Sequence, residues 1–76
     1  MNIMKSFQEH IIIDANIRFG KPVLKNTRIS VSDVLGWLSN GMSKEDILSD
    51  FPELNEDMIL ACLAFVANRE NNILVA

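Results

Sequence analysis

The single His and the single Cys of this sequence, His10 and Cys62, are of types that act as bases, nucleophiles or metal ligands. His10 has no second His, Cys or acid at ligand spacing, so it is typical of an ordinary strand or surface residue. Cys62 lies among Ile59, Leu63 and Val66, where a cysteine usually serves as a small buried apolar group. We therefore predict no catalytic, cofactor-binding or metal site, and a protein that is not an enzyme.

Two further patterns could mimic a catalytic or phosphate site. The acids of the second half of the chain precede or open apolar runs, which is where carboxylates cap helices and stabilise the helix dipole. Paired-carboxylate catalysis is therefore not expected. Gly20-Lys21-Pro22 lacks the glycine spacing and the following Ser or Thr of a phosphate loop.

The charges are divided along the chain. Residues 1–31 hold five Lys and Arg residues and two acids, which gives a net charge of +3. Residues 32–76 hold two Lys and Arg residues and eight acids, which gives a net charge of −6. Such a division favours one anionic and one cationic partner; the alternative is that both faces are simply solvated. The candidate nucleic-acid contacts are Arg18, Lys21, Lys25 and Arg28.

These four cations lie in a segment that the pattern assigns to short strands. We expect strands at Ile11–Ile13 and Ile17–Phe19, and a hairpin from Pro22 to Val31 that turns at Lys25-Asn26. Doubled in a dimer, the cations could face DNA or RNA as a β-ribbon does. The alternative for Arg28 is that it braces the strands against Asp33 or a helix C-terminus.

Three helices are expected after the strands. Ser30 and Ser43 each precede an acid by three residues, the spacing of a capping box, and Asn55 is a third N-cap. The first helix should run over Val31–Ser39 with an apolar stripe of Val31, Val34, Leu35 and Leu38. The second should expose its acids and bury Ile47, Leu48 and Phe51. The third should bury Met58, Ile59, Cys62, Leu63, Phe65 and Val66 and end near Asn71-Asn72.

Two apolar features are candidates for partner binding. Trp37 flanks the stripe of the first helix, where it is either half-buried core or an interface anchor, and Gly36 beside it allows the close approach of another backbone. Residues 73–76 form an apolar tail that docks on a partner or pairs with the N-terminal strands. Its large side chains are Ile73, Leu74 and Val75.

Length and composition predict one small domain that associates. The chain has 76 residues, of which 49% are hydrophobic, and a single cysteine, so no disulfide within the chain can stabilise it. A domain of this size buries only about 60% of its unfolded surface, which favours a homodimer. No segment reaches the roughly 20 apolar residues of a membrane span, and no signal peptide is visible, so we expect a cytoplasmic protein without a membrane partner.

The stretch that joins strands to helices carries a family resemblance. Residues Gly20-Lys21-Pro22-Val23-Leu24-Lys25-Asn26-Thr27-Arg28-Ile29-Ser30-Val31 resemble the G-K-P-V-hydrophobic-x-G-T-R-I-x-V signature of the domain-of-unknown-function family 433. Asn26 stands where the family usually has Gly. The likeness continues through Gly41-Met42-Ser43, Asp50-Phe51-Pro52 and Ala61-Cys62-Leu63-Ala64. It implies a helix-turn-helix-like domain, an antitoxin paired with a nuclease-like toxin of the Vap class, and no catalytic residues.

The predicted fold is α+β. Short N-terminal antiparallel strands (residues 1–31) precede a homeodomain-like three-helix region (32–72) and the apolar tail (73–76), all in one domain. Two functions compete. One is an antitoxin-like protein that binds a nuclease-like toxin and operator DNA; the other is a small dimeric interaction module without a nucleic-acid role. The third helix opens with Glu56-Asp57, which would repel phosphates, so any nucleic acid should contact the strand region.

Overall fold

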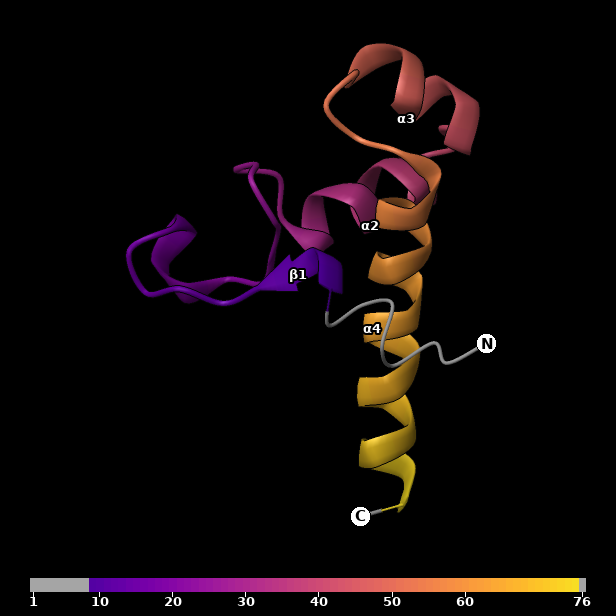
Figure 1. The fold of residues 1–76 in the computed structure, drawn as a ribbon. Coiled ribbons are helices and arrows are strands. Elements are labelled where there is room, and N and C mark those ends of the chain that lie inside the picture. The colour runs from indigo at the N-terminus through magenta and orange to yellow at the C-terminus, as the bar shows by residue number, and fades with distance from the viewer. Residues whose placement is uncertain (1–8, 76) are drawn as a thin grey trace.

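The computed structural model describes the backbone of residues 9–75 and the side chains of residues 9–69. A two-stranded antiparallel sheet precedes three helices (Figure 1), so the predicted α+β arrangement is confirmed. The elements are β1 (Ile11–Ile12), the 3₁₀ turn η1 (Arg18–Gly20), β2 (Val23–Leu24), α2 (Val31–Ser39), α3 (Lys44–Asp50) and α4 (Glu56–Val75).

The sheet is small, and the predicted turn follows its second strand. Ile11 pairs with Leu24 across the sheet, and the Leu24 amide also donates to the Ile29 carbonyl at 2.8 Å. The Thr27 amide donates to the Leu24 carbonyl at 3.0 Å, which closes a turn with Asn26 at a φ of 67°. A left-handed third residue is typical of a type II turn, and Asn accepts this backbone more readily than most residues.

The strand predicted at Ile17–Phe19 is wrong. The Ile17 amide instead donates to the Asp14 carbonyl at 2.9 Å, which bends the chain back before a strand can form. Arg18 and Phe19 then take left-handed φ values of 51° and 59°, and Gly20 takes 82°. Alternation of apolar and polar residues is a weak signal over three residues, and turn chemistry at Asp14 overrides it.

The helix boundaries follow the predicted caps. The Ser30 hydroxyl accepts from the Asp33 amide at 3.0 Å while Asp33 accepts from the Ser30 amide at 3.1 Å, so both halves of this capping box are present. Ser43 and Asp46 form the same motif, and Asn55 Oδ1 accepts from the amide of Met58. The three predicted N-caps are therefore confirmed.

The end of α2 is a Schellman motif. The Met42 amide donates to the Trp37 carbonyl and the Gly41 amide donates to the Leu38 carbonyl, both at 3.1 Å. Gly41 has a φ of 98°, a backbone conformation that residues with a Cβ rarely adopt. The predicted end of this helix at Ser39 is thus confirmed, and the chain turns after it toward α3.

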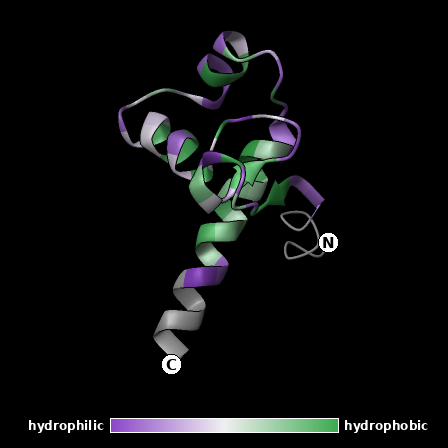
Figure 2. Cartoon of the chain, turned by 90° about the vertical axis from the view of Figure 1, so that its left-hand side faces the viewer, coloured by the Kyte–Doolittle hydropathy of each residue, from purple (hydrophilic) through white to green (hydrophobic). Residues whose placement is uncertain are grey.

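One core joins the hairpin to all three helices. Figure 2 shows hydrophobic residues gathered where α2 and α4 meet. Its buried members are Leu24, Val31, Val34, Ile47, Leu54, Ile59 and Cys62, and the half-buried side chains packed around them include Leu35, Leu38, Leu48, Phe51, Met58, Phe65 and Val66. The helical residues predicted to be buried are all among them except Leu63, which is 45% exposed, whereas Leu24 and Leu54 lie outside the helices and were not predicted by helical spacing.

Two expectations about the helices need correction. Asn71-Asn72 do not end the last helix, because α4 continues to Val75 and the helical hydrogen-bond ladder tolerates both residues. No atom lies within 4 Å of the place where a Cβ on Gly36 would be, so no other backbone of the described chain approaches that glycine. The side chains of Ile73, Leu74 and Val75 lie outside the described residues, and docking of the tail stays a prediction.

Candidate interaction surfaces

Arg18 is half-buried and paired, so it does not belong to an open cationic surface. Its Nη1 donates to the Asp33 carboxylate at 3.1 Å and to the Arg28 carbonyl at 2.7 Å. Partial burial raises the pKa of Asp33, but hydrogen bonds from the Ser30 backbone and from Arg18 outweigh it and leave that pKa below its ordinary value. The brace to Asp33 that the sequence suggested for Arg28 is therefore made by Arg18.

The other three predicted nucleic-acid contacts are exposed. Lys21, Lys25 and Arg28 lie around the hairpin that β2 begins, and the segment 18–28 contains no acid. The hairpin holds their backbone in place, since the Lys25 amide donates to the His10 carbonyl at 2.7 Å. We call Lys21, Lys25 and Arg28 the cationic hairpin. It is a fixed positive surface that can bind an anion such as a phosphate backbone.

The opposite charge collects around α3 and the start of α4. The exposed acids of residues 44–57 are Glu45, Asp46, Asp50, Glu53, Glu56 and Asp57, and the single cation of this segment, Lys44, pairs with Glu56. Figure 1 places α3 and the first turn of α4 at one end of the molecule, away from the β1–β2 loop. This acidic end suits a basic partner.

An apolar stripe continues from the acidic end along α4. Glu56, Leu60, Leu63 and Ala67 follow one another at helical spacing, and all four are exposed. Leu60 is 51% exposed and Leu63 is 45% exposed, although both are large apolar side chains. We call these four residues the α4 outer face. Exposed leucines beside carboxylates are typical of a surface that binds a partner with both basic and apolar groups.

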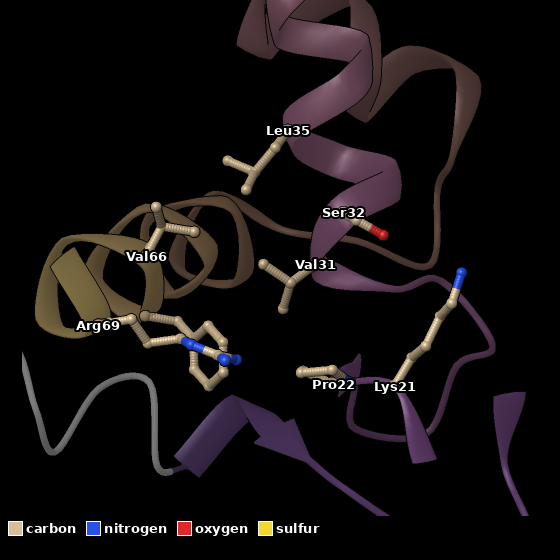
Figure 3. Close-up of a pocket in the computed structure, with 8 residues that line it drawn as sticks. Lys21, Pro22, Val31, Ser32, Leu35, Val66 and Arg69 are labelled. Carbon is tan, nitrogen blue, oxygen red and sulfur yellow. The ribbon is translucent and has the colours of Figure 1, made fainter. Parts of the chain in front are cut away.

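A groove lies on the other side of α4, between it and α2. It encloses about 390 Å³ and its lining is mostly apolar, with Lys21, Ser32 and Arg69 as the polar members. The apolar lining residues are Pro22, Val31, Leu35, Phe65 and Val66. In Figure 3 the side chains of Leu35, Val31 and Val66 surround this α2–α4 groove, and Arg69 and Lys21 lie on opposite sides of Pro22. The Arg69 guanidinium carbon lies 5.3 Å from the centroid of the Phe65 ring.

Trp37, the other predicted partner contact, is part of the core periphery. It is half-buried, and its ring stacks on Phe51 with centroids 4.2 Å apart and planes inclined by 12°. The stack joins the end of α2 to the end of α3. This geometry matches the interpretation of Trp37 as half-buried core rather than as a free anchor.

The thiol of Cys62 lies in the core of the protein. Cys62 is fully buried, and burial raises the pKa of its thiol to about 12. No group of three or more His, Cys, Asp and Glu side chains among the described residues could hold a metal ion. No helix within the described part of the chain has the length and apolar character to cross a membrane.

Three features of these surfaces escaped the sequence reasoning. Phe19 is 99% exposed and Ile13 is 64% exposed, both in the loop between β1 and β2. The exposure of Leu60 and the presence of the groove were not predicted either. Asp14, a turn former directly after Ile13, was the signal that the second strand would not form and that Phe19 would be left in a loop.

Comparisons with known proteins agree on a family and on a fold. The model of a family described as "Protein of unknown function (DUF433)" matches residues 11–66. A crystal structure of a DUF433 member protein from Anabaena variabilis is similar with a TM-score of 0.70 and 26% identity, over 90% of this chain and 68% of that one. No curated protein matches the chain.

Proposed function

The chain belongs to the DUF433 family of proteins of unknown function, and from its surfaces we propose an antitoxin-like role in which it binds a nuclease-like toxin and operator DNA. The observation that carries the proposal is the separation of exposed charge. Residues 18–28 hold three exposed cations, a fourth cation paired with Asp33 and no acid, whereas residues 44–57 hold six acids and one paired cation. One surface thus suits a nucleic acid and the other suits a basic protein.

The toxin contacts the acidic end and the α4 outer face. A nuclease that binds RNA or DNA needs a basic rim, and the exposed acids around Glu53 and Glu56 attract such a rim over several ångströms. Leu60 and Leu63 then supply apolar area that the toxin covers. Binding there would mask the nuclease because the acids compete with nucleic-acid phosphates for the same basic groups.

DNA contacts the cationic hairpin and not α4. The α3 helix, the residues from Phe51 to Asn55 and α4 have the proportions of a helix-turn-helix, which the family resemblance also implies. However, Glu56 and Asp57 occupy the first turn of α4, where a recognition helix would approach phosphates. Lys21, Lys25 and Arg28 are exposed, so they make the phosphate contacts.

The second candidate is a small interaction module without a nucleic-acid role. The pairing of Arg18 with Asp33 favours it, because this pairing removes one of four cations from the surface. Three exposed cations per chain give a weaker phosphate-binding surface than four. The two candidates share the α4 outer face and differ only in the role of the cationic hairpin.

The salt dependence of DNA binding separates the two candidates. Affinity for a duplex of the chain's own upstream region should fall with salt, and Lys25→Ala and Arg28→Ala should each lower the log–log slope by about 0.9 for every phosphate that the variant no longer neutralises. Arg18→Lys is the matched control, since it keeps the charge and should leave the slope unchanged. No binding at low salt, or slopes that the hairpin variants leave unchanged, would assign the chain to the second candidate.

The toxin surface is tested by co-purification with the protein encoded by the neighbouring gene. The double variant Leu60→Ala, Leu63→Ala should lose that partner, because the two leucine side chains contribute to binding when the partner covers them. Lys25→Ala is the control and should keep it. Retention of the partner by the leucine variant, with the fold intact by circular dichroism, would show that the α4 outer face is not the binding surface.

A further inference from the structure

Phe19 stands out of the fold on a firmly held loop. It is 99% exposed. Left-handed backbone at a non-glycine residue costs about 1–3 kcal/mol, so it persists only where the surroundings fix it. The surroundings here are the two hydrogen bonds of the Arg18 guanidinium, to Asp33 and to the Arg28 carbonyl. The fold therefore fixes the backbone that carries this large apolar ring and leaves the ring in water.

The loop that carries Phe19 has the composition of a binding segment. We call residues 13–20 the Phe19 loop; Figure 1 shows it projecting from the side of the helices between β1 and β2. It presents two of the large exposed apolar side chains of the described chain, Phe19 and Ile13, and one exposed carboxylate, Asp14. The loop thus offers a partner two apolar side chains and one carboxylate, while its own cation, Arg18, is paired with Asp33.

The α2–α4 groove offers the complement. Its volume of about 390 Å³ is within the range of about 300–1,000 Å³ that is typical of pockets that bind ligands. Its lining is apolar apart from Ser32 and the two cations at its border, Lys21 and Arg69. A phenyl ring fits the apolar walls, and a carboxylate on the same loop can pair with one of the cations.

We propose that the Phe19 loop of one copy fills the α2–α4 groove of a second copy, and that the second copy returns the same contact. Lys21 borders the groove and follows Phe19 by two residues, so the two Cα atoms are at most roughly 7 Å apart. The projecting ring and the groove are therefore neighbours on each chain. A two-fold axis between the two chains places the ring of each chain in the groove of the other. This is the self-complementary arrangement of a closed dimer.

Charge and composition favour a second copy over a foreign protein. Asp14 of one chain meets Lys21 or Arg69 of the other, so the loop brings a carboxylate to one of the two cations at the border of the groove that it enters. The exchange also covers apolar surface in a chain whose residues are 49% hydrophobic. The exchange uses Lys21 of the cationic hairpin but leaves Lys25, Arg28 and the α4 outer face open, and it does not depend on the proposed function.

The first test is the dimer dissociation constant from sedimentation equilibrium. The wild-type chain should be a dimer at about 10 μM, and Phe19→Ala should weaken the dimer by at least about 100-fold, because each dimer then lacks both of its central aromatic rings. The matched control is Leu63→Ala, which removes an exposed apolar side chain of α4 and should leave the constant unchanged. Circular dichroism should show the same helix content in all three, since the Phe19 side chain is almost fully exposed in its own chain.

Val66→Glu tests the groove from the other side. A carboxylate on its wall should weaken the dimer as Phe19→Ala does, and an equimolar mixture of the two variants should regain part of the association. In the mixed dimer, the intact Phe19 ring of the Val66→Glu chain can enter the intact groove of the Phe19→Ala chain. A dimer of either variant alone has no intact ring facing an intact groove. Gain on mixing distinguishes ring-in-groove exchange from general loss of fold.

Three results would overturn the proposal. The wild-type chain could remain a monomer at about 100 μM, which would leave the groove to another occupant, such as residues 1–8 or a foreign protein. The dimer could withstand Phe19→Ala. Leu63→Ala could weaken the dimer instead, which would place the interface on the α4 outer face.

Discussion

Arg18 Nη1 lies 3.1 Å from Asp33 Oδ2 and 2.7 Å from the Arg28 carbonyl oxygen, so one guanidinium ties the Phe19 loop to both α2 and the hairpin. Asp33 also caps α2 through the Ser30 amide at 3.1 Å. The Asp33 carboxylate therefore caps the start of α2 and also holds a loop that is far from it in sequence. The family-like stretch from Gly20 to Val31 lies between the two residues that form this ion pair.

Replacement of the two partners should have unequal effects on stability. Arg18→Ala should lower the free energy of unfolding by about 1 kcal/mol or less, because both side chains are about one-third exposed and solvent screens the pair. Asp33→Ala should cost about 1–2 kcal/mol, since it also removes half of a capping box. Urea unfolding at one fixed protein concentration measures both. Equal losses would show that the cap contributes nothing beyond the ion pair.

The acid stability of the protein should depend on Asp33. Its pKa is lowered in the fold from an ordinary value of 3.8, so its contribution is fully present above that value and is lost as the pH falls through the lower folded value. The difference in unfolding free energy between the wild type and Asp33→Asn should be constant from about pH 5 to 8 and shrink below about pH 4. A difference that persists at about pH 2 would contradict this origin.

Local chemistry explains which parts of the fold were predictable. Ser30, Ser43 and Asn55 act on amides within three residues, so helix starts could be predicted from the sequence alone. Asn26 likewise determines its own turn. Arg18 was assigned to the surface because its partner Asp33 lies fifteen residues away and only the folded chain brings them together. The same holds for the groove, whose walls come from three separate segments.

Gly36 marks a place where stability can be gained. It lies inside α2, and no atom is within 4 Å of the position that an alanine methyl group would take, so Gly36→Ala adds a helix-favouring residue without a clash. The substitution should raise the unfolding free energy by about 0.5–1 kcal/mol. Thermal unfolding beside the wild type measures the change. A loss of stability that grows with protein concentration would instead show that another chain approaches this glycine.

Cys62 should be inert in the native state. Burial raises its pKa to about 12, so the thiolate that reacts with maleimides is scarce at neutral pH. Labelling should be slow in buffer and fast in urea. Because the ordinary value is 9.0, the stability due to the buried thiol is fully present below that pH and decreases as the pH rises toward about 12. Cys62→Ala should remove this alkaline decrease, and rapid native labelling would contradict the buried position.

The central claim is that the acidic end and the α4 outer face mask a nuclease. The most direct measurement is the ribonuclease activity of the protein encoded next to this chain, titrated with purified chain. One equivalent of wild type should abolish the activity, and Lys25→Ala should do the same. The double variant Leu60→Ala, Leu63→Ala should need at least about tenfold more protein. Full activity in the presence of excess wild-type chain, with the nuclease shown to be folded, would contradict the claim.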